Sequence, residues 1–338
     1  MSSAKELGER KIIELILNCI DQMPDMVIPF GDDASAVDFG ISKLAVINVD
    51  MLVKKTDVPP NMSTWQAARK AVIMNISDLA AKGAKPIALL ASIGIPPDLN
   101  RKDIIQIGKG LNAGAREYSA YILGGDTNEA SDLVISCMAL GVCPKHYLIK
   151  RSGAKPGDYV AVTGTFGKTV SGLKILIDGL SAPSWQKVLV DSVLMPKARV
   201  KEGIALAHSQ VATSAIDSSD GLAWSLYELS RASEVGFRIN NLPIAPEVEI
   251  FAKFHGFDSA ELALYGGEEY ELLVTIKPKL WSKAKKAVEA VGGNLIKIGV
   301  VTKDRHLLLE TSEKPVSIKA QGWEHFKNEK ENIGDAVK

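Results

Sequence analysis

The chain has 338 residues, which is enough for two domains of ordinary size. Its 46% hydrophobic and 24% charged residues are typical of a folded globular protein and exclude a disordered one. Lys plus Arg and Asp plus Glu both number 40, so the chain has no net charge that would attract nucleic acid or a membrane surface.

The N-terminal segment and the cysteines indicate a cytoplasmic protein. Charged residues interrupt the apolar ones over residues 1–20, which predicts an amphipathic helix rather than a signal peptide. No stretch approaches the roughly 20 apolar residues that cross a membrane. Cys19, Cys137 and Cys143 show neither CxxC spacing nor a paired framework, as expected in a reducing compartment. Even spacing in an apolar stretch predicts that the last two face a core.

Strands and helices are both predicted in the first half of the chain. A strand over residues 43–50 ends in an acidic residue. Ser63 and Thr64 are predicted to cap a helix over residues 64–82, with Gly83 at its C-terminal end. The pattern then predicts a strand, a helix and two strands, over residues 86–96, 102–118, 120–126 and 132–143.

A turn-rich segment, RSGAKPGD at residues 151–158, separates this half from the next. We therefore expect one domain over residues 1–150 and a second over residues 151–338. Strands in the second half are predicted over residues 158–164, 212–217, 270–276, 294–301 and 306–310. Helices are predicted over residues 169–180, 222–233 and 279–291, with further helices before residue 208 and before residue 270. The mixture predicts an α/β or α+β fold in two halves.

Acidic residues beside glycines recur along most of the chain. The motifs are GDD with Asp32 and Asp33, NVD ending at Asp50, NISDLAAKG with Asp78, GGDT with Asp126, DSSDG with Asp217 and Asp220, and GGEE with Glu268 and Glu269. Glycine lets the backbone turn sharply and approach a ligand. A carboxylate on such a turn is a hard oxygen ligand that suits magnesium beside phosphate. Together the motifs predict a nucleotide-polyphosphate site built around several divalent cations.

Each motif also has a simpler interpretation. Asp78 shares a helix face with Asn75, but it could instead form a surface pair with Lys82. GDD and GGDT could be tight turns, although two adjacent acids repel each other and a cation would offset that repulsion. Helix capping explains one acid of DSSDG but not both. The guanidinium of Arg151 suits phosphate, and it could equally be a surface charge of the linker.

The segment GTFGKT at residues 164–169 resembles a phosphate-binding loop only superficially. That loop needs a glycine five residues before the GK pair, where this chain has Val162. We interpret the segment as a glycine turn at a helix N-terminus, which could still assist anion binding. The histidines have no metal-ligand spacing and no GxSxG motif is present, so zinc chemistry and acyl transfer are not expected.

The order of the motifs resembles the thiamine-monophosphate kinase family, in the superfamily of aminoimidazole ribonucleotide synthetase. The resemblance runs from about residue 8 to residue 327 and rests on GDDA, SDLAAKGAKP, GGDT, RSGAKPGD, IDSSDGL, GGEEYELL and GWEHF. It implies an α/β fold of two domains, with an N-terminal sheet that pairs with its twin in a homodimer and a C-terminal α/β domain that closes the cleft. It also implies transfer of the γ-phosphate of ATP to thiamine monophosphate, assisted by several Mg²⁺ ions.

The resemblance also implies roles for individual residues. The magnesium ligands would be Asp33, Asn48, Asp50, Asp78, Asp126, Asp217 and Asp220. The contacts to ATP would come from Gly125, Asp126, Arg151 and Ser219, and those to the thiamine moiety from Asp57, Glu268 and Trp323. Turnover is expected to depend on Asp126 and Asp220.

Four positions depart from the family pattern. Asn48 and Val49 stand where Ser or Thr ligands are common, Asp57 takes the place of a histidine near the substrate, and Glu269 replaces an aspartate. Two alternatives therefore stay open: another ATP-dependent enzyme of the superfamily, and a binding protein for ATP and thiamine phosphates that has no catalytic activity.

Overall fold

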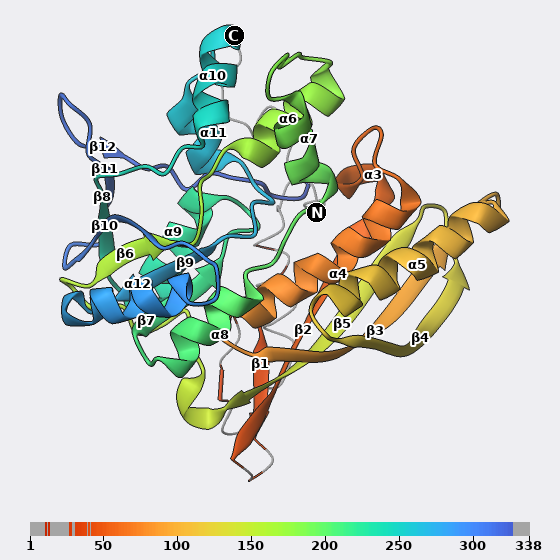
Figure 1. Cartoon of the computed structure of the whole chain (residues 1–338), viewed down its shortest axis with the longest axis horizontal. Coiled ribbons are helices and arrows are strands. Elements are labelled where there is room, and N and C mark those ends of the chain that lie inside the picture. The colour runs from red at the N-terminus through yellow and green to blue at the C-terminus, as the bar shows by residue number, and fades with distance from the viewer. Residues whose placement is uncertain are drawn as a thin grey trace.

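The computed structural model describes residues 11, 13, 27–28, 31–38, 40 and 42–326. The helix predicted at the N-terminus lies outside these residues except for Lys11 and Ile13, which are helical, and Cys19 also lies outside them. Two β-sheets with helices packed against them form the described part of the chain (Figure 1). No helix within it is both long and apolar enough to span a membrane.

The first sheet has five strands and is built from the N-terminal half of the chain. In spatial order its strands are β1 (Ser35–Asp38), β2 (Lys43–Val53), β5 (Val134–Pro144), β3 (Lys85–Ile95) and β4 (Tyr121–Glu129). Only β3 and β4 are parallel to each other. Helices α4 (Thr64–Ala81) and α5 (Arg101–Glu117) cover one face of this sheet, and the one-turn helix α3 (Lys54–Asp57) follows β2 (Figure 1).

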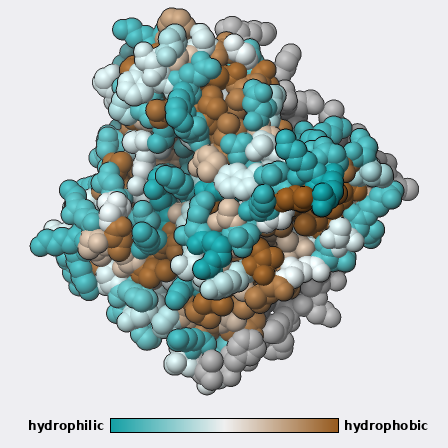
Figure 2. Space-filling model, turned by 45° about the vertical axis from the view of Figure 1, so that its right-hand side comes forward, coloured by the Kyte–Doolittle hydropathy of each residue, from teal (hydrophilic) through white to brown (hydrophobic). Residues whose placement is uncertain are grey.

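The other face of the first sheet carries exposed apolar side chains. Val49, Met138 and Leu90 are paired across β2, β5 and β3, so their side chains share one face. The side chains of Val49 and Leu90 are 65% and 43% exposed, and Met51 beside them is 55% exposed. Figure 2 shows hydrophobic atoms in several places among the hydrophilic surface of the molecule. A sheet face of this kind is typical of a surface that another chain covers.

Helix α4 begins and ends where the sequence predicts. Ser63 and Gln66 form a capping box, in which Ser63 Oγ accepts from the Gln66 N–H and Gln66 Oε1 accepts from the Ser63 N–H. Gly83 takes the left-handed φ of 65° that ends a helix. Small residues let α5 approach closely, because a Cβ on Gly110 would lie 2.2 Å from the carbonyl oxygen of Trp65.

The second sheet has seven strands and is built from the C-terminal half. In spatial order its strands are β12 (Val316–Ser317), β11 (Leu307–Leu309), β8 (Gly236–Ile239), β10 (Ile296–Thr302), β6 (Tyr159–Val162), β9 (Leu272–Ile276) and β7 (Ala212–Asp217). The helices of this half are α6 (Lys168–Asp178), α7 (Gln186–Leu194), α8 (Val200–His208), α9 (Leu222–Ser233), α10 (Pro246–His255), α11 (Ser259–Tyr265) and α12 (Trp281–Glu289). Short 3₁₀ turns, η1 (Lys145–Tyr147) and η2 (Pro278–Leu280), complete the elements.

The structure confirms the predicted α/β class and adds three strands that the sequence pattern missed. These are β1, β8 and β12, which have only two to four residues each and so give too short a periodic signal. Cys137 and Cys143 are fully buried, as predicted. Burial raises the pKa of their thiols to about 12 and about 11.

Helix α4 also links the two halves. It contacts β2, β3 and β5 on one side and α8 and β7 of the second half on the other. Arg69 is buried, pairs with Glu117 at 2.6 Å and donates to the carbonyl oxygen of Pro196 at 2.9 Å. A Cβ on Gly203 in α8 would lie 2.0 Å from the carbonyl oxygen of Ala80. Side chains from both halves therefore meet beside α4.

Candidate active site beside helix α4

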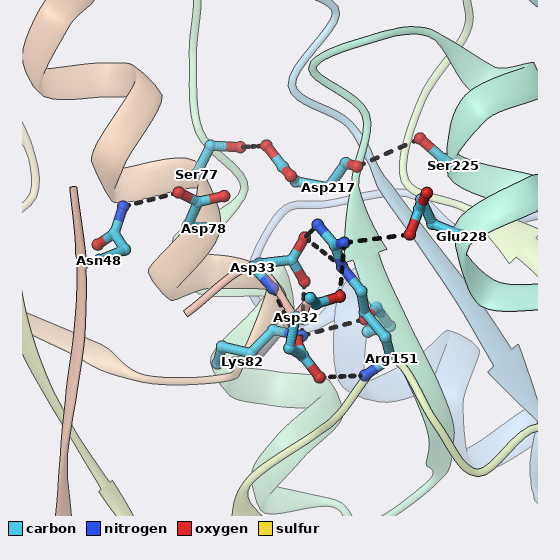
Figure 3. A network of polar contacts seen from close by, with 12 residues as sticks. Asp32, Asp33, Asn48, Ser77, Asp78, Lys82, Arg151, Asp217, Ser225 and Glu228 are labelled. Carbon is cyan, nitrogen blue, oxygen red and sulfur yellow. Dashed lines mark hydrogen bonds and ion pairs between the residues drawn. The ribbon is translucent and has the colours of Figure 1, made fainter. Parts of the chain in front are cut away.

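Three predicted metal ligands converge from distant parts of the chain. Asp33 ends the GDD turn, Asp78 lies on α4 and Asp217 ends β7 (Figure 3). Each offers a carboxylate oxygen, and these oxygens all lie within 4.8 Å of one another. Carboxylates at this spacing repel one another unless a proton or a cation lies between them.

Asn48 and Asn75 position the residues at the β2 side of the cluster. Asn48 Nδ2 donates to Asp78 Oδ2 at 2.7 Å, and the backbone N–H of Asp50 donates to Asn75 Oδ1 at 3.1 Å. The amide oxygen of Asn48 is buried and has no hydrogen-bond partner among the residues described. A buried oxygen without a donor, beside carboxylates, is suited to coordinate a hard cation. The donor set therefore fits magnesium.

Burial makes two of these carboxylates hold a proton more tightly. Burial, with the negative charges of Asp50 and Asp217 added to it, raises the pKa of Asp78 well above its usual range. Burial and the charge of Asp33 raise the pKa of Asp217 to about 7, against a hydrogen bond of 2.6 Å from Ser77 Oγ. Both groups therefore gain from a bound cation, which would favour their ionised forms.

Asp33 differs because two cations already contact it. Arg151 Nη2 lies 2.6 Å from its Oδ1, and Lys82 Nζ lies 2.6 Å from its Oδ2 (Figure 3). Burial opposes its ionisation, but the two cations hold the pKa of Asp33 below its usual value. Lys82 is fully buried and also pairs with Asp32 at 2.5 Å. The alternative of a surface pair between Asp78 and Lys82 is therefore wrong.

The predicted substrate contacts gather around a second buried lysine, Lys70 on α4. Its ammonium donates to the carbonyl oxygen of Asp57 at 2.8 Å and forms an ion pair with Oε1 of Glu268. The Asp57 carboxylate accepts from the backbone N–H of Val53 at 2.6 Å, which holds it at the end of β2. Sequence reasoning missed Lys70, because a lysine within a helix is most often a solvent-exposed residue.

The GGEE loop lies along the DSSDG turn. The backbone N–H of Glu268 donates to the carbonyl oxygen of Ser219 at 2.5 Å, and the N–H of Trp323 donates to that of Asp220 at 3.1 Å. These contacts bring four of the predicted residues together. Glu268 also has a left-handed φ of 63°, a strained conformation that is common at functional sites.

Tyr270 directly follows the GGEE motif, and its backbone N–H donates to the carbonyl oxygen of Ser218 at 2.9 Å. Its side chain is buried, and burial raises the pKa of its phenol well above the usual range. The negative charges of Glu268, Asp50 and Asp217 raise it further. The phenol stays protonated and can act only as a neutral group within the acidic site.

Glu269 has a structural position that the sequence did not reveal. Its Oε1 accepts from the backbone N–H groups of Gly167 at 2.7 Å and of Thr169 at 3.1 Å, at the start of α6. The chain's own carboxylate therefore fills the helix end that a phosphate would take. The interpretation of GTFGKT as an ordinary glycine turn is confirmed.

Asp126 and Gly125 lie away from the cluster within one chain. Gly125 pairs with Ala91, Ala91 with Cys137, and Cys137 with Asp50, so three strand spacings, roughly 14 Å in all, separate Gly125 from Asp50. The side chain of Asp126 lies on the opposite face of the sheet, because neighbouring residues of a strand alternate between faces. No helix of the described part of the chain packs against that face.

Comparison with known proteins places this site in a family. The chain matches the AIR synthase related protein models, with the N-terminal domain over residues 31–143 and the C-terminal domain over residues 155–311. Thiamine-monophosphate kinase from Pyrococcus horikoshii is 38% identical over 324 residues, covering 95% of this chain and 97% of the relative. The chain belongs to the thiamine-monophosphate kinase family. The Escherichia coli member is 32% identical over 89% of this chain and 93% of its own length.

Solved structures of this family share the fold. Thiamine monophosphate kinase from Aquifex aeolicus superposes with a TM-score of 0.77 and 25% identity, over 90% of this chain and 97% of that one. The structure of AaThiL complexed with AMPPCP and TMP gives a TM-score of 0.82 and 26% identity, over 96% and 99%. The two-domain fold that the sequence predicted is confirmed.

Proposed function

We propose that this member of the kinase family transfers the γ-phosphate of ATP to thiamine monophosphate and so forms thiamine diphosphate and ADP. The observation that carries the proposal is the acidic cluster of Asp33, Asp78 and Asp217 beside a separate end that holds Asp57 and Glu268. The names of the curated relatives, and the complex of AaThiL with AMPPCP and TMP, support this choice of substrates.

The chemistry needs little from the protein except placement. A phosphate oxygen of thiamine monophosphate attacks the γ-phosphorus of ATP, and the bond to the oxygen that bridges the β- and γ-phosphates breaks. The acceptor is a phosphate monoester with a second pKa near 6, so it is already largely ionised at neutral pH. No general base is required to create the nucleophile. The protein must instead bring two negative groups together.

We propose that several magnesium ions bind here. Their ligands would be Asp33, Asn48, Asp50, Asp78 and Asp217, together with Asp126 and Asp220. The unpaired amide oxygen of Asn48 and the raised pKa values of Asp78 and Asp217 support this set. When bound, such ions neutralise the charge on the phosphate groups of both substrates.

The nucleotide is proposed to bind near Arg151 and Ser219. Arg151 presents its guanidinium between Asp33 and Glu228, at 2.6 and 3.6 Å, so its planar donor fork faces the acidic cluster. Asp126 and Gly125 of the GGDT motif are proposed as further ATP contacts.

Thiamine monophosphate is proposed to bind between Asp57, Glu268 and Trp323. Thiamine carries a positive charge on its thiazolium ring, which carboxylates and the face of an indole ring both attract. The backbone contacts of Glu268 and Trp323 to Ser219 and Asp220 of the DSSDG turn support a position of this proposed site beside the proposed metal ligands.

We further propose a homodimer in which the uncovered face of the first sheet packs against its twin. The exposed Val49, Met51 and Leu90 support this, because a monomer rarely leaves such a face open to water. Asp126 lies on the same face, in register with Met51 through Ser136 and Ser92. In such a dimer, Asp126 of the partner subunit would complete the site of the first.

Two broader assignments accompany this proposal. We propose that the chain divides into domains at residues 1–150 and 151–338, as the turn-rich segment at residues 151–158 indicates. We also propose a cytoplasmic location, as the three cysteines without CxxC spacing or a paired framework indicate.

Incubation of the purified protein with ATP, magnesium and thiamine monophosphate tests the function. Chromatography should show thiamine diphosphate and ADP in equal amounts, and EDTA should stop their formation. Asp98→Asn, at an exposed position outside the site, should behave like the wild type. Calorimetric binding of ATP without any thiamine diphosphate would instead identify a protein that binds these ligands without catalysis.

A further inference from the structure

We propose that Lys70 is a positioning residue for substrate binding, which holds one oxygen of Glu268 so that the other faces the thiamine moiety. The inference rests on the proposed function, because it concerns how Glu268 meets its substrate. It goes beyond that function by giving a role to a residue that the motifs do not include.

The position of Lys70 leaves its ammonium few alternatives. The side chain is 1% exposed on α4, and its Nζ contacts the carbonyl oxygen of Asp57 and Oε1 of Glu268. A buried ammonium requires such partners, since burial of an unpaired charge costs several kcal/mol. The ion pair also joins α4 in the first half of the chain to the GGEE loop in the second. Lys70 therefore fixes where the GGEE loop sits relative to α4.

Glu268 needs this support more than an ordinary glutamate does. Its side chain has three rotatable bonds and is 25% exposed, so burial alone does not select one orientation. Its backbone lies in a strained left-handed conformation directly after two glycines. Because the ion pair engages Oε1 and the side chain stays partly exposed, Oε2 is the oxygen that we infer to accept from a donor of the substrate.

An argument from charge alone predicts that Lys70 weakens the binding of thiamine monophosphate, whereas a positioning role predicts that Lys70 strengthens it. Thiamine is a cation, so a second cation near Glu268 would oppose binding, and removal of Lys70 would strengthen it. If Lys70 instead positions Glu268, its removal weakens binding. The sign of the change therefore separates the two explanations.

The experiment is a double-mutant cycle of Lys70→Met and Glu268→Gln, measured as KM for each substrate. We expect Lys70→Met to raise KM for thiamine monophosphate roughly 10- to 100-fold, the range for loss of a charge-assisted hydrogen bond. KM for ATP should change less than about twofold. In the Glu268→Gln background the same substitution should have almost no further effect, because the carboxylate that it orients is gone.

Two further variants guard against a purely structural explanation. Lys174→Met removes another buried lysine, which lies on α6 with its ammonium 4.6 Å from the centre of the Phe257 ring, and should leave both KM values unchanged. Lys70→Gln keeps a hydrogen-bond donor without the charge, so it should give an intermediate KM for thiamine monophosphate. It also serves as the test variant if Lys70→Met does not fold.

The outcomes separate this inference from the function on which it rests. An unchanged or lowered KM for thiamine monophosphate in a folded Lys70 variant would overturn the inference but not the proposed function. The inference would also be overturned if Lys70→Met raised this KM by the same factor with and without Glu268→Gln. If the wild type forms no thiamine diphosphate, the proposed function fails. The cycle is then measured by calorimetric binding of thiamine monophosphate, and a wild type that does not bind it would overturn the inference as well.

Discussion

At the scale of single residues, the acidic cluster divides into carboxylates with opposite tendencies. Lys82 and Arg151 lower the pKa of Asp33, whereas burial raises those of Asp78 and Asp217. Negative charge therefore stays on Asp33, and the other two carboxylates carry an electrostatic cost when ionised without a cation. This cost supports the proposal that those two residues bind a cation, because ionised and without one they do not stabilise the fold.

Asp78→Asn should separate catalysis from stability. Turnover should fall at least about 100-fold, because a proposed magnesium ligand is lost. The melting temperature in EDTA at pH 8 should stay equal or rise, because a buried and repelled charge is removed. Product formation and thermal denaturation with and without magnesium measure both effects. A large drop of the melting temperature in EDTA would show that Asp78 is a structural residue instead.

Glu269 should make stability depend on pH. Burial raises its pKa from 4.5 to about 7, so the folded protein binds this proton more tightly than the unfolded chain does. The resulting cost is fully present above pH 7 and is lost as the pH falls toward 4.5. Wild-type stability relative to Glu269→Gln should therefore increase between pH 8 and pH 5.5, by on the order of 1 kcal/mol. Urea denaturation in EDTA at both pH values measures this, and an unchanged difference would contradict it.

The residues also show what the sequence could and could not predict. Asp33, Asp78 and Asp217 were recognisable because each stands in a glycine-bearing motif. Their pairing partners were not, because Lys82 and Lys70 meet carboxylates that lie tens to hundreds of residues away along the chain. Local spacing predicts which side chains share a helix face, but it does not predict which distant loop packs against that face.

At the scale of elements, two glycines of α5 differ in how closely α4 approaches them. Gly110 faces α4, and a Cβ there would meet the backbone of Trp65 at 2.2 Å. Gly108 has no atom within 4 Å of the corresponding position. Start and end signals made both helices predictable from sequence, whereas this contact depends on tertiary packing.

Substitution of each glycine by alanine should therefore have opposite effects on stability. Gly110→Ala should destabilise the protein by about 2 kcal/mol or more, since α5 must move away from α4. Gly108→Ala should stabilise it by about 0.5–1 kcal/mol, because alanine favours the helix and meets no neighbour. Chemical denaturation of the two variants gives the comparison, and effects of the same sign would contradict the packing described here.

At the scale of the whole molecule, the separation of Asp126 from the cluster predicts a shared active site. Asp126→Asn and Asp78→Asn should each be inactive as homodimers. After mixing and subunit exchange, half of the dimers should contain one intact site, so activity should return to about a quarter of the wild-type value. Product formation by the mixture, with each variant alone as control, measures this. If the mixture stays inactive after verified subunit exchange, the site is built from one chain.

Helix α4 also sets a length. Lys70 at the substrate end and Asp78 at the metal end are eight residues apart on one rigid helix, which corresponds to about 12 Å along its axis. The capping box at Ser63 and the turn at Gly83 fix both ends of this helix, so the distance does not vary as a loop would allow. In the proposed site, the helix would therefore fix the distance between the organic part of the acceptor and the phosphates. A phosphate ester whose organic group lies much nearer to or farther from its phosphate would then be unable to contact both ends of the proposed site at once.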